Sequence, residues 1–138
     1  MRQFLRVPQR VHNAVILMAD LAEYGSVDLV SLNEVAERNG LSRGFLEEVV
    51  VPLREAGLVE AKRGVGGGYK LARAPGEISV ADIVTAIEGP VAFVDCLGAV
   101  QCPAAGSCSS KRVWAGVQQR VEESLAGMSL AEVIGQKK

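Results

Sequence analysis

The sequence has no excess of either charge. Fifteen Lys and Arg residues stand against sixteen Asp and Glu residues, which gives a formal net charge of −1 at pH 7. A strongly basic protein attracts nucleic acid or anionic membrane through its overall field, and this balance excludes that mode of binding. Any nucleic-acid partner must therefore be held by a local group of cations.

The sequence also lacks a long hydrophobic run. The longest apolar stretch, residues 14–22, is interrupted by Asp20 and falls far short of the roughly 20 residues that a membrane-spanning helix needs. No basic segment, apolar segment and small-residue cleavage site follow one another near Met1, which is the order typical of a secretory signal. We therefore expect a cytoplasmic protein with no membrane partner.

Catalytic residue types are scarce. The chain has a single histidine, and no nucleophile–base pair is evident. A glycine-rich run, residues 64–68, could suggest a phosphate-binding loop, but no Lys-Ser/Thr pair and no helix signal follow it. We expect neither an enzyme nor a small-molecule substrate. With 138 residues, 49% apolar and 22% charged, the composition is that of a soluble globular protein with a core that needs no disulfides.

Capping and stop signals divide the first half of the chain into helices and a hairpin. A proline in a first turn, a Ser-to-Glu capping box and glycine stops predict helices over residues 8–24, 31–40 and 42–57. Two short strands, residues 58–62 and 69–71, follow on either side of the glycine-rich loop. This order predicts a mainly α fold with a small β-wing, a winged helix-turn-helix whose third helix enters the major groove of DNA.

Charged residues gather where such a fold meets DNA. Ser42 and Arg43 begin the expected recognition helix, where side chains and free backbone N–H groups meet phosphates, and Glu47 can accept a hydrogen bond from a cytosine amino group. Arg54 lies near the end of this helix, and Lys62 and Arg63 flank the wing. Residues 1–75 are thus predicted to form a DNA-binding domain. The alternative is an ordinary solvated face, because many small helical domains contain a helix-turn-helix look-alike.

The remaining residues, 76–138, are expected to form a second unit around an irregular loop. A helix opens at a capping signal near residue 79 and closes at Gly89-Pro90, and residues 91–110 show no period. A helix over residues 111–126 then carries an apolar stripe with a period of four, made of Val113, Val117, Val121 and Leu125. The stripe must pack against the rest of the domain or against a second subunit.

All three cysteines lie in the irregular loop. Five residues separate Cys96 from Cys102, and five separate Cys102 from Cys108. The odd number and a reducing compartment argue against a disulfide framework. Zinc sites usually pair cysteines two to four residues apart, so this spacing fits zinc poorly, whereas an iron–sulfur cluster needs four ligands and a loose loop. An iron–sulfur cluster, a thiol redox switch and a zinc site all stay open on these residues alone.

Several segments together resemble one family over nearly the full chain. They are Arg10–Ala14, Leu41–Glu47, Leu53–Val59 and Arg63–Tyr69, followed by the three cysteines. In these the chain resembles the Rrf family of winged-helix regulators, of the IscR/NsrR type. The resemblance implies a homodimer joined by a long C-terminal dimerisation helix, a palindromic operator on double-stranded DNA, and a 2Fe–2S or 4Fe–4S cluster that tunes DNA binding. It also assigns DNA-contacting positions to Glu47, Arg54 and Arg63.

One position departs from the IscR-like pattern. That pattern has a histidine three residues after the last cysteine, and Lys111 stands there in this chain, where an ammonium group is no ligand. NsrR-like members take a fourth ligand from the first helix of the partner subunit, and His12 falls at the matching position. A neutral imidazole suits iron. The alternative role for His12 is that of a packed or capping residue. The fourth ligand would then be Asp95, Ser109, Ser110, a small thiol or water.

The residues and the resemblance together favour a homodimeric, sequence-specific DNA-binding transcriptional regulator whose affinity is tuned by an iron–sulfur cluster. The resemblance implies that such a cluster would report iron–sulfur supply, iron, nitric oxide or redox stress. The alternative is a cluster-free winged-helix regulator controlled by thiol redox, zinc or a protein partner. An electron-transfer protein is a third possibility, and it would need neither a recognition helix nor a wing.

Overall fold

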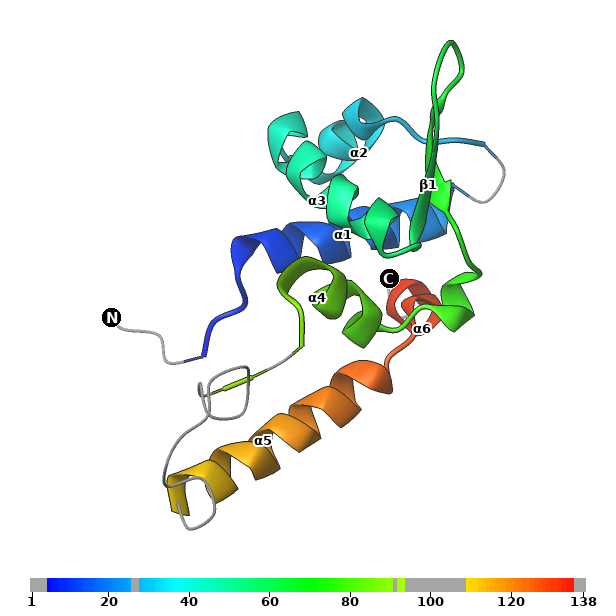
Figure 1. The fold of residues 1–138 in the computed structure, drawn as a ribbon. Helices are drawn as coiled ribbons and strands as arrows, with labels where there is room; N and C mark the ends of the chain where they lie inside the picture. Colours follow the sequence, from blue (N-terminus) through cyan, green and yellow to red (C-terminus); the bar gives the residue numbers. More distant parts are fainter. Residues whose placement is uncertain (1–4, 26–27, 91, 94–108, 136–138) are drawn as a thin grey trace.

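The computed structural model describes residues 5–25, 28–90, 92–93 and 109–135 (Figure 1). Helices dominate the structure, with one two-stranded antiparallel sheet, so the predicted fold class is confirmed. The elements are α1 (Gln9–Tyr24), α2 (Leu32–Asn39), α3 (Arg43–Glu55), β1 (Val59–Lys62), β2 (Gly68–Leu71), the 3-10 turn η1 (Pro75–Glu77), α4 (Val80–Glu88), α5 (Ser109–Ala126) and α6 (Leu130–Gly135).

The helix starts predicted from capping boxes are confirmed. The Ser31 hydroxyl accepts from the Glu34 backbone N–H at 3.2 Å, and the Glu34 carboxylate accepts from the Ser31 N–H at 2.8 Å. Ser79 and Asp82 repeat this exchange at the start of α4, with both distances at 3.0 Å. Each box satisfies backbone N–H groups that a helix start otherwise leaves unpaired. Local sequence therefore determines where these two helices begin.

A glycine sets the turn between α2 and α3. Gly40 has φ 63°, in the left-handed region, and the Leu41 N–H donates to the Ala36 carbonyl at 3.1 Å. An added Cβ would meet nothing within 4 Å, so the demand at this position is on backbone conformation and not on space. Glycine adopts this conformation without the steric cost that other residues meet. The predicted break between a helix that ends near Gly40 and one that begins near Ser42 is confirmed.

The hydrophobic core surrounds α1, which runs through the middle of the molecule (Figure 1). Helices α3, α4 and α6 all pack against it. The largest fully buried side chains include Leu17, Met18, Leu46 and Leu53 from the first half of the chain, and Ile78, Ile83 and Leu130 from the second. One core thus continues past residue 75. The domain boundary predicted there stays a prediction.

An ion pair with a buried carboxylate fastens α2 to α1. The Asp20 side chain is 3% exposed and accepts from Arg38 Nη2 at 2.8 Å and from Arg38 Nε at 3.0 Å. Asn39 Nδ2 donates to the same carboxylate at 2.9 Å, and the Arg38 guanidinium lies 4.2 Å from the centre of the Tyr24 ring. The hydrogen bond to Asp20 raises the pKa of Arg38. Every charge in this cluster is therefore matched by a partner.

Helix α5 differs from the other long helices. It begins at Ser109, two residues before the predicted start, and none of its residues is buried. Val117, Val121 and Leu125 of the predicted stripe are half-buried, while Val113 is 57% exposed. The helix contacts α4 and extends away from the core (Figure 1). In the described part of the chain, no helix is long and apolar enough to cross a membrane.

Candidate nucleic-acid interface

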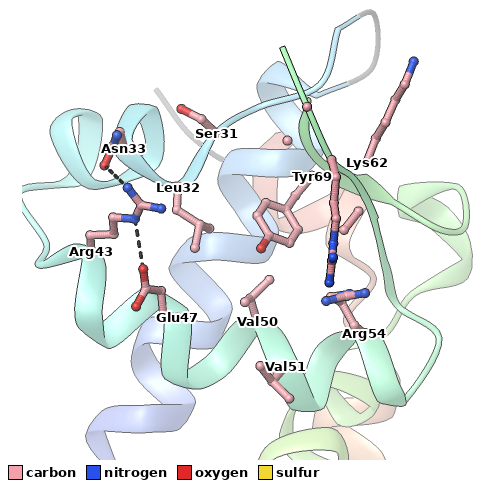
Figure 2. A pocket seen from close by; sticks show the side chains of 14 residues that line it. Ser31, Leu32, Asn33, Arg43, Glu47, Val50, Val51, Arg54, Lys62 and Tyr69 are labelled. Atoms are coloured by element: carbon pink, nitrogen blue, oxygen red, sulfur yellow. Dashed lines mark hydrogen bonds and ion pairs between the residues drawn. The ribbon is translucent and has the colours of Figure 1, made fainter. Parts of the chain in front are cut away.

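A groove of about 560 Å³ separates α3 from the wing (Figure 2). Its walls come from the start of α2, one face of α3, and the two strands with the loop between them. Among the lining residues are five of the six residues predicted to contact DNA, namely Arg43, Glu47, Arg54, Lys62 and Arg63. The structure thus brings residues that are 20 positions apart in the chain to one surface.

The face of α3 toward the groove is set by helical spacing. Arg43, Glu47, Val50 and Arg54 stand at i, i+4, i+7 and i+11, which places them along one side of a helix. Residues on the adjoining side, Leu46, Val49 and Leu53, are buried in the core. Burial of that apolar side fixes the rotation of α3 about its axis. The polar side is consequently held toward the groove.

At the start of α3 the polar residues are linked to one another. Arg43 Nε donates to Glu47 Oε1 at 3.0 Å, and Arg43 Nη1 donates to Asn33 Oδ1 at 3.4 Å (Figure 2). Ser42 caps the helix, since its hydroxyl accepts from the Gly44 N–H at 3.1 Å. The predicted contact Ser42 is therefore used first as a cap, and it is absent from the groove lining.

The other end of the groove carries three cations. Arg54 lies on the last turn of α3, and Lys62 and Arg63 lie where β1 passes into the wing loop. No carboxylate of the described residues comes within 4.0 Å of the charged nitrogens of these three side chains. Figure 2 shows the Lys62 ammonium directed away from Arg54, so it lies on the outer rim. This end can accept an anion such as a phosphate.

The wing is fastened to the segment before α2. Val30 and Tyr69 exchange two backbone hydrogen bonds, at 2.9 Å and 2.7 Å. Gly68 allows this close approach, because an added Cβ would lie 2.6 Å from the Val30 carbonyl oxygen. The Tyr69 ring then lies between the wing and Val50, inside the groove (Figure 2). Sequence reasoning missed both Tyr69 and Asn33, since neither carries a charge.

The predicted start of each strand is wrong by one residue, whereas the predicted ends at Lys62 and Leu71 are confirmed. Gly68, assigned to the loop, belongs to β2 because it pairs with Lys62 across the hairpin. Leu58, assigned to the first strand, precedes β1 and is 1% exposed. Its N–H donates to Leu53 at the end of α3, and its carbonyl accepts from Ala72. Leu58 thus closes the core beneath the hairpin.

The predicted metal ligands are divided between described and undescribed parts of the chain. Cys96, Cys102 and Cys108 lie outside the described residues. His12 lies on the first half of α1 with its side chain exposed, and it does not line the groove. Within the described ranges no group of three or more His, Cys, Asp or Glu could hold a metal ion. The donor set itself, three thiols and an accessible imidazole, fits an iron–sulfur cluster.

Comparisons with known proteins agree on one family. The Rrf2 family, described as an iron-dependent transcriptional regulator, matches residues 7–136. The HTH-type transcriptional regulator IscR of Aliivibrio salmonicida is 33% identical over 130 residues, which are 94% of this chain and 77% of that protein. Among solved structures, IscR of T. potens is 37% identical with a TM-score of 0.80, covering 97% of this chain and 89% of that one. CymR, the global cysteine regulator of B. subtilis, is 29% identical with a TM-score of 0.82, covering 97% and 99%.

Proposed function

This chain belongs to the Rrf2 family of transcriptional regulators, and we propose that it is a homodimer that binds a palindromic operator under the control of an iron–sulfur cluster. The groove between α3 and the wing is the observation that carries the DNA-binding part. On one side of this groove, α3 presents a polar face that can enter a major groove of DNA. The groove also contains three cations that no described carboxylate neutralises.

The charges in the groove suit a DNA backbone. Each phosphate that a Lys or Arg neutralises releases counterions, so the logarithm of the binding constant falls with the logarithm of salt by roughly 0.9 per contact. Arg54, Lys62 and Arg63 together would contribute a slope of roughly −2.7 per subunit on that rule. A chain with a net charge of −1 can bind DNA in this way because its cations are gathered on one face.

The exposed α5 supports a homodimer. An isolated 18-residue helix gains little stability by itself in water, and most helices in proteins are stabilised by packing one apolar face. A second copy of α5 would cover Val113, which is 57% exposed, and the remaining open surface of Val117, Val121 and Leu125 through a two-fold contact. Two recognition helices related in this way read half-sites about 34 Å apart, one turn of the duplex.

The cysteine segment and His12 supply the donors for the cluster. Thiolates hold iron–sulfur clusters, and imidazoles replace two of them in Rieske centres, so Cys96, Cys102, Cys108 and His12 of the partner subunit make a chemically competent set. When bound, the cluster would supply one-electron redox chemistry and sensitivity to small oxidants. His12 lies on the same helix as Asp20, which holds α2 of the DNA-reading pair. Ligation would thereby connect the cluster to that pair.

A cluster-free regulator is the second candidate, and the similarity to CymR favours it. One solved relative is an oxidized form of CymR from Staphylococcus aureus, 29% identical to this chain with a TM-score of 0.76. In that case DNA binding would be controlled by oxidation of the three cysteine thiols, by zinc bound to them, or by a protein partner. DNA binding through the groove is common to both candidates.

An absorption spectrum of protein purified anaerobically, with iron and acid-labile sulfide counted per chain, separates the two candidates. The proposal predicts visible sulfide-to-iron bands with matched iron and sulfide, and His12→Ala should lose the cluster faster under air because one ligand is gone. A protein that stays colourless after reconstitution with iron and sulfide would contradict cluster binding. Sedimentation of the same sample tests the dimer, which would be refuted by a monomer at micromolar concentration.

A further inference from the structure

The side chains at the start of α3 form a connected unit. Glu47 accepts from Nε of Arg43, and Asn33 of α2 accepts from Nη1 at the longer distance of 3.4 Å (Figure 2). Arg43 Nη2 has no hydrogen-bond partner among the described residues. The guanidinium is thus held along its Nε edge by a carboxylate while its outer end stays open.

Helix stability does not explain an arginine at this position. Arg43 is the first residue of α3, where the positive end of the helix dipole disfavours a cation. Helices α2 and α4 instead place Glu34 and Asp82 in their first turns. An ion pair with Arg before Glu at i,i+4 also stabilises a helix less than the reverse order does. Both side chains are more than half exposed. The pair therefore contributes little to folding.

The free end of Arg43 has the shape that reads guanine. A guanidinium donates two parallel hydrogen bonds to O6 and N7 of guanine in the major groove, which is the commonest specific contact in protein–DNA complexes. Holding the side chain in one rotamer before binding lowers the entropy cost of that contact. Arg43 also lies on the same face of α3 as Arg54, whose partner would be a phosphate.

We propose that Arg43 reads one guanine in each half-site of the operator, and that Glu47 acts as its positioning residue. The inference rests on the proposed function and refines the expectation that Glu47 itself accepts from a cytosine. In this arrangement the carboxylate orients the guanidinium, and the guanine takes the two hydrogen bonds at its open end. Asn33 adds a contact from α2, so residues of both α2 and α3 hold the Arg43 guanidinium in place.

Selection from a library of random DNA duplexes tests the assignment without knowledge of the operator. The full chain, purified anaerobically, would be compared with Arg43→Ala, Glu47→Ala, the double variant and Glu47→Gln. The unsubstituted protein should prefer guanine at one position per half-site by about tenfold or more, and Arg43→Ala should abolish that preference alone. Glu47→Ala should weaken it at the same position, and Glu47→Gln, which keeps an acceptor for Nε, should restore it.

Three different outcomes would contradict the role of Arg43, the role of Glu47 and the proposed function, respectively. If Arg43→Ala lowers affinity equally for all sequences, Arg43 is a phosphate contact and the inference is wrong. If Glu47→Ala changes a different position from Arg43→Ala, Glu47 reads a base itself and is no positioning residue. If the unsubstituted protein selects no sequence at all, the proposed function fails before the inference is tested. Arg54→Ala is the matched control, expected to lower affinity without changing the selected sequence.

Discussion

Two ion pairs on neighbouring helices show how differently the same chemistry can be used. Arg38 and Asp20 join α2 to α1 with the carboxylate 3% exposed, whereas Arg43 and Glu47 lie within α3 with 57% and 56% of their side chains exposed. In the first pair both carboxylate oxygens of Asp20 accept hydrogen bonds, while the Arg38 side chain remains 33% exposed. The second stays open to a ligand. Burial therefore separates a pair that holds the fold from a pair that is available for recognition.

Removal of the buried carboxylate should have the largest effect on stability. Asp20→Ala leaves the Arg38 guanidinium and the Asn39 amide without their shared acceptor, in a place that the core partly covers. We expect a loss of about 2–4 kcal/mol in the free energy of unfolding. Urea titration followed by circular dichroism measures it. A loss below about 0.5 kcal/mol would mean that this pair contributes no more to stability than an ordinary surface ion pair, and would contradict the prediction.

A change of cation should have an intermediate effect. Arg38→Lys keeps the charge but cannot make the two-pronged contact with Asp20 or lie flat above Tyr24. We expect a loss of about 1 kcal/mol, read as a lower thermal midpoint. Arg43→Lys is the matched control on α3 and should leave the midpoint nearly unchanged. Equal shifts in the two variants would show that burial does not distinguish these pairs.

Removal of the exposed carboxylate should have the smallest effect. Glu47→Ala breaks a pair whose members both remain hydrated, and alanine favours the helix. The free energy of unfolding should change by less than about 0.5 kcal/mol in either direction. The same urea titration checks this expectation. A loss as large as that of Asp20→Ala would mean that the start of α3 depends on this pair.

The sequence was sufficient wherever the determining contact is short in range. The capping boxes of Ser31 and Ser79 and the left-handed turn at Gly40 are decided within three or four residues, and their positions were predicted. Strand limits were missed by one residue at Leu58 and Gly68 because core packing and cross-strand pairing set them. Those interactions join residues that the local pattern does not relate.

Longer-range contacts could not be predicted from spacing. The partner of Asp20 lies 18 residues away and depends on how α1 and α2 cross. The contact between Asn33 and Arg43 needs the whole turn at Gly40, and the position of Tyr69 needs the bridge to Val30. Residue type and position on the predicted recognition helix and wing, together with the family resemblance, did select Arg43, Glu47, Arg54, Lys62 and Arg63, and the structure gathers them at one groove. Their contact with DNA stays a prediction.

Fluorescence anisotropy with a labelled duplex tests the central claim most directly, that the open groove between α3 and the wing binds DNA. The comparison is between the unsubstituted chain and Arg54→Ala/Arg63→Ala, on a duplex taken from the selected pool. The account predicts an affinity at least about tenfold weaker, and a slope of log affinity against log salt that is shallower by about 1.8 per subunit. The thermal midpoint should stay unchanged. Undiminished affinity and slope would contradict the account.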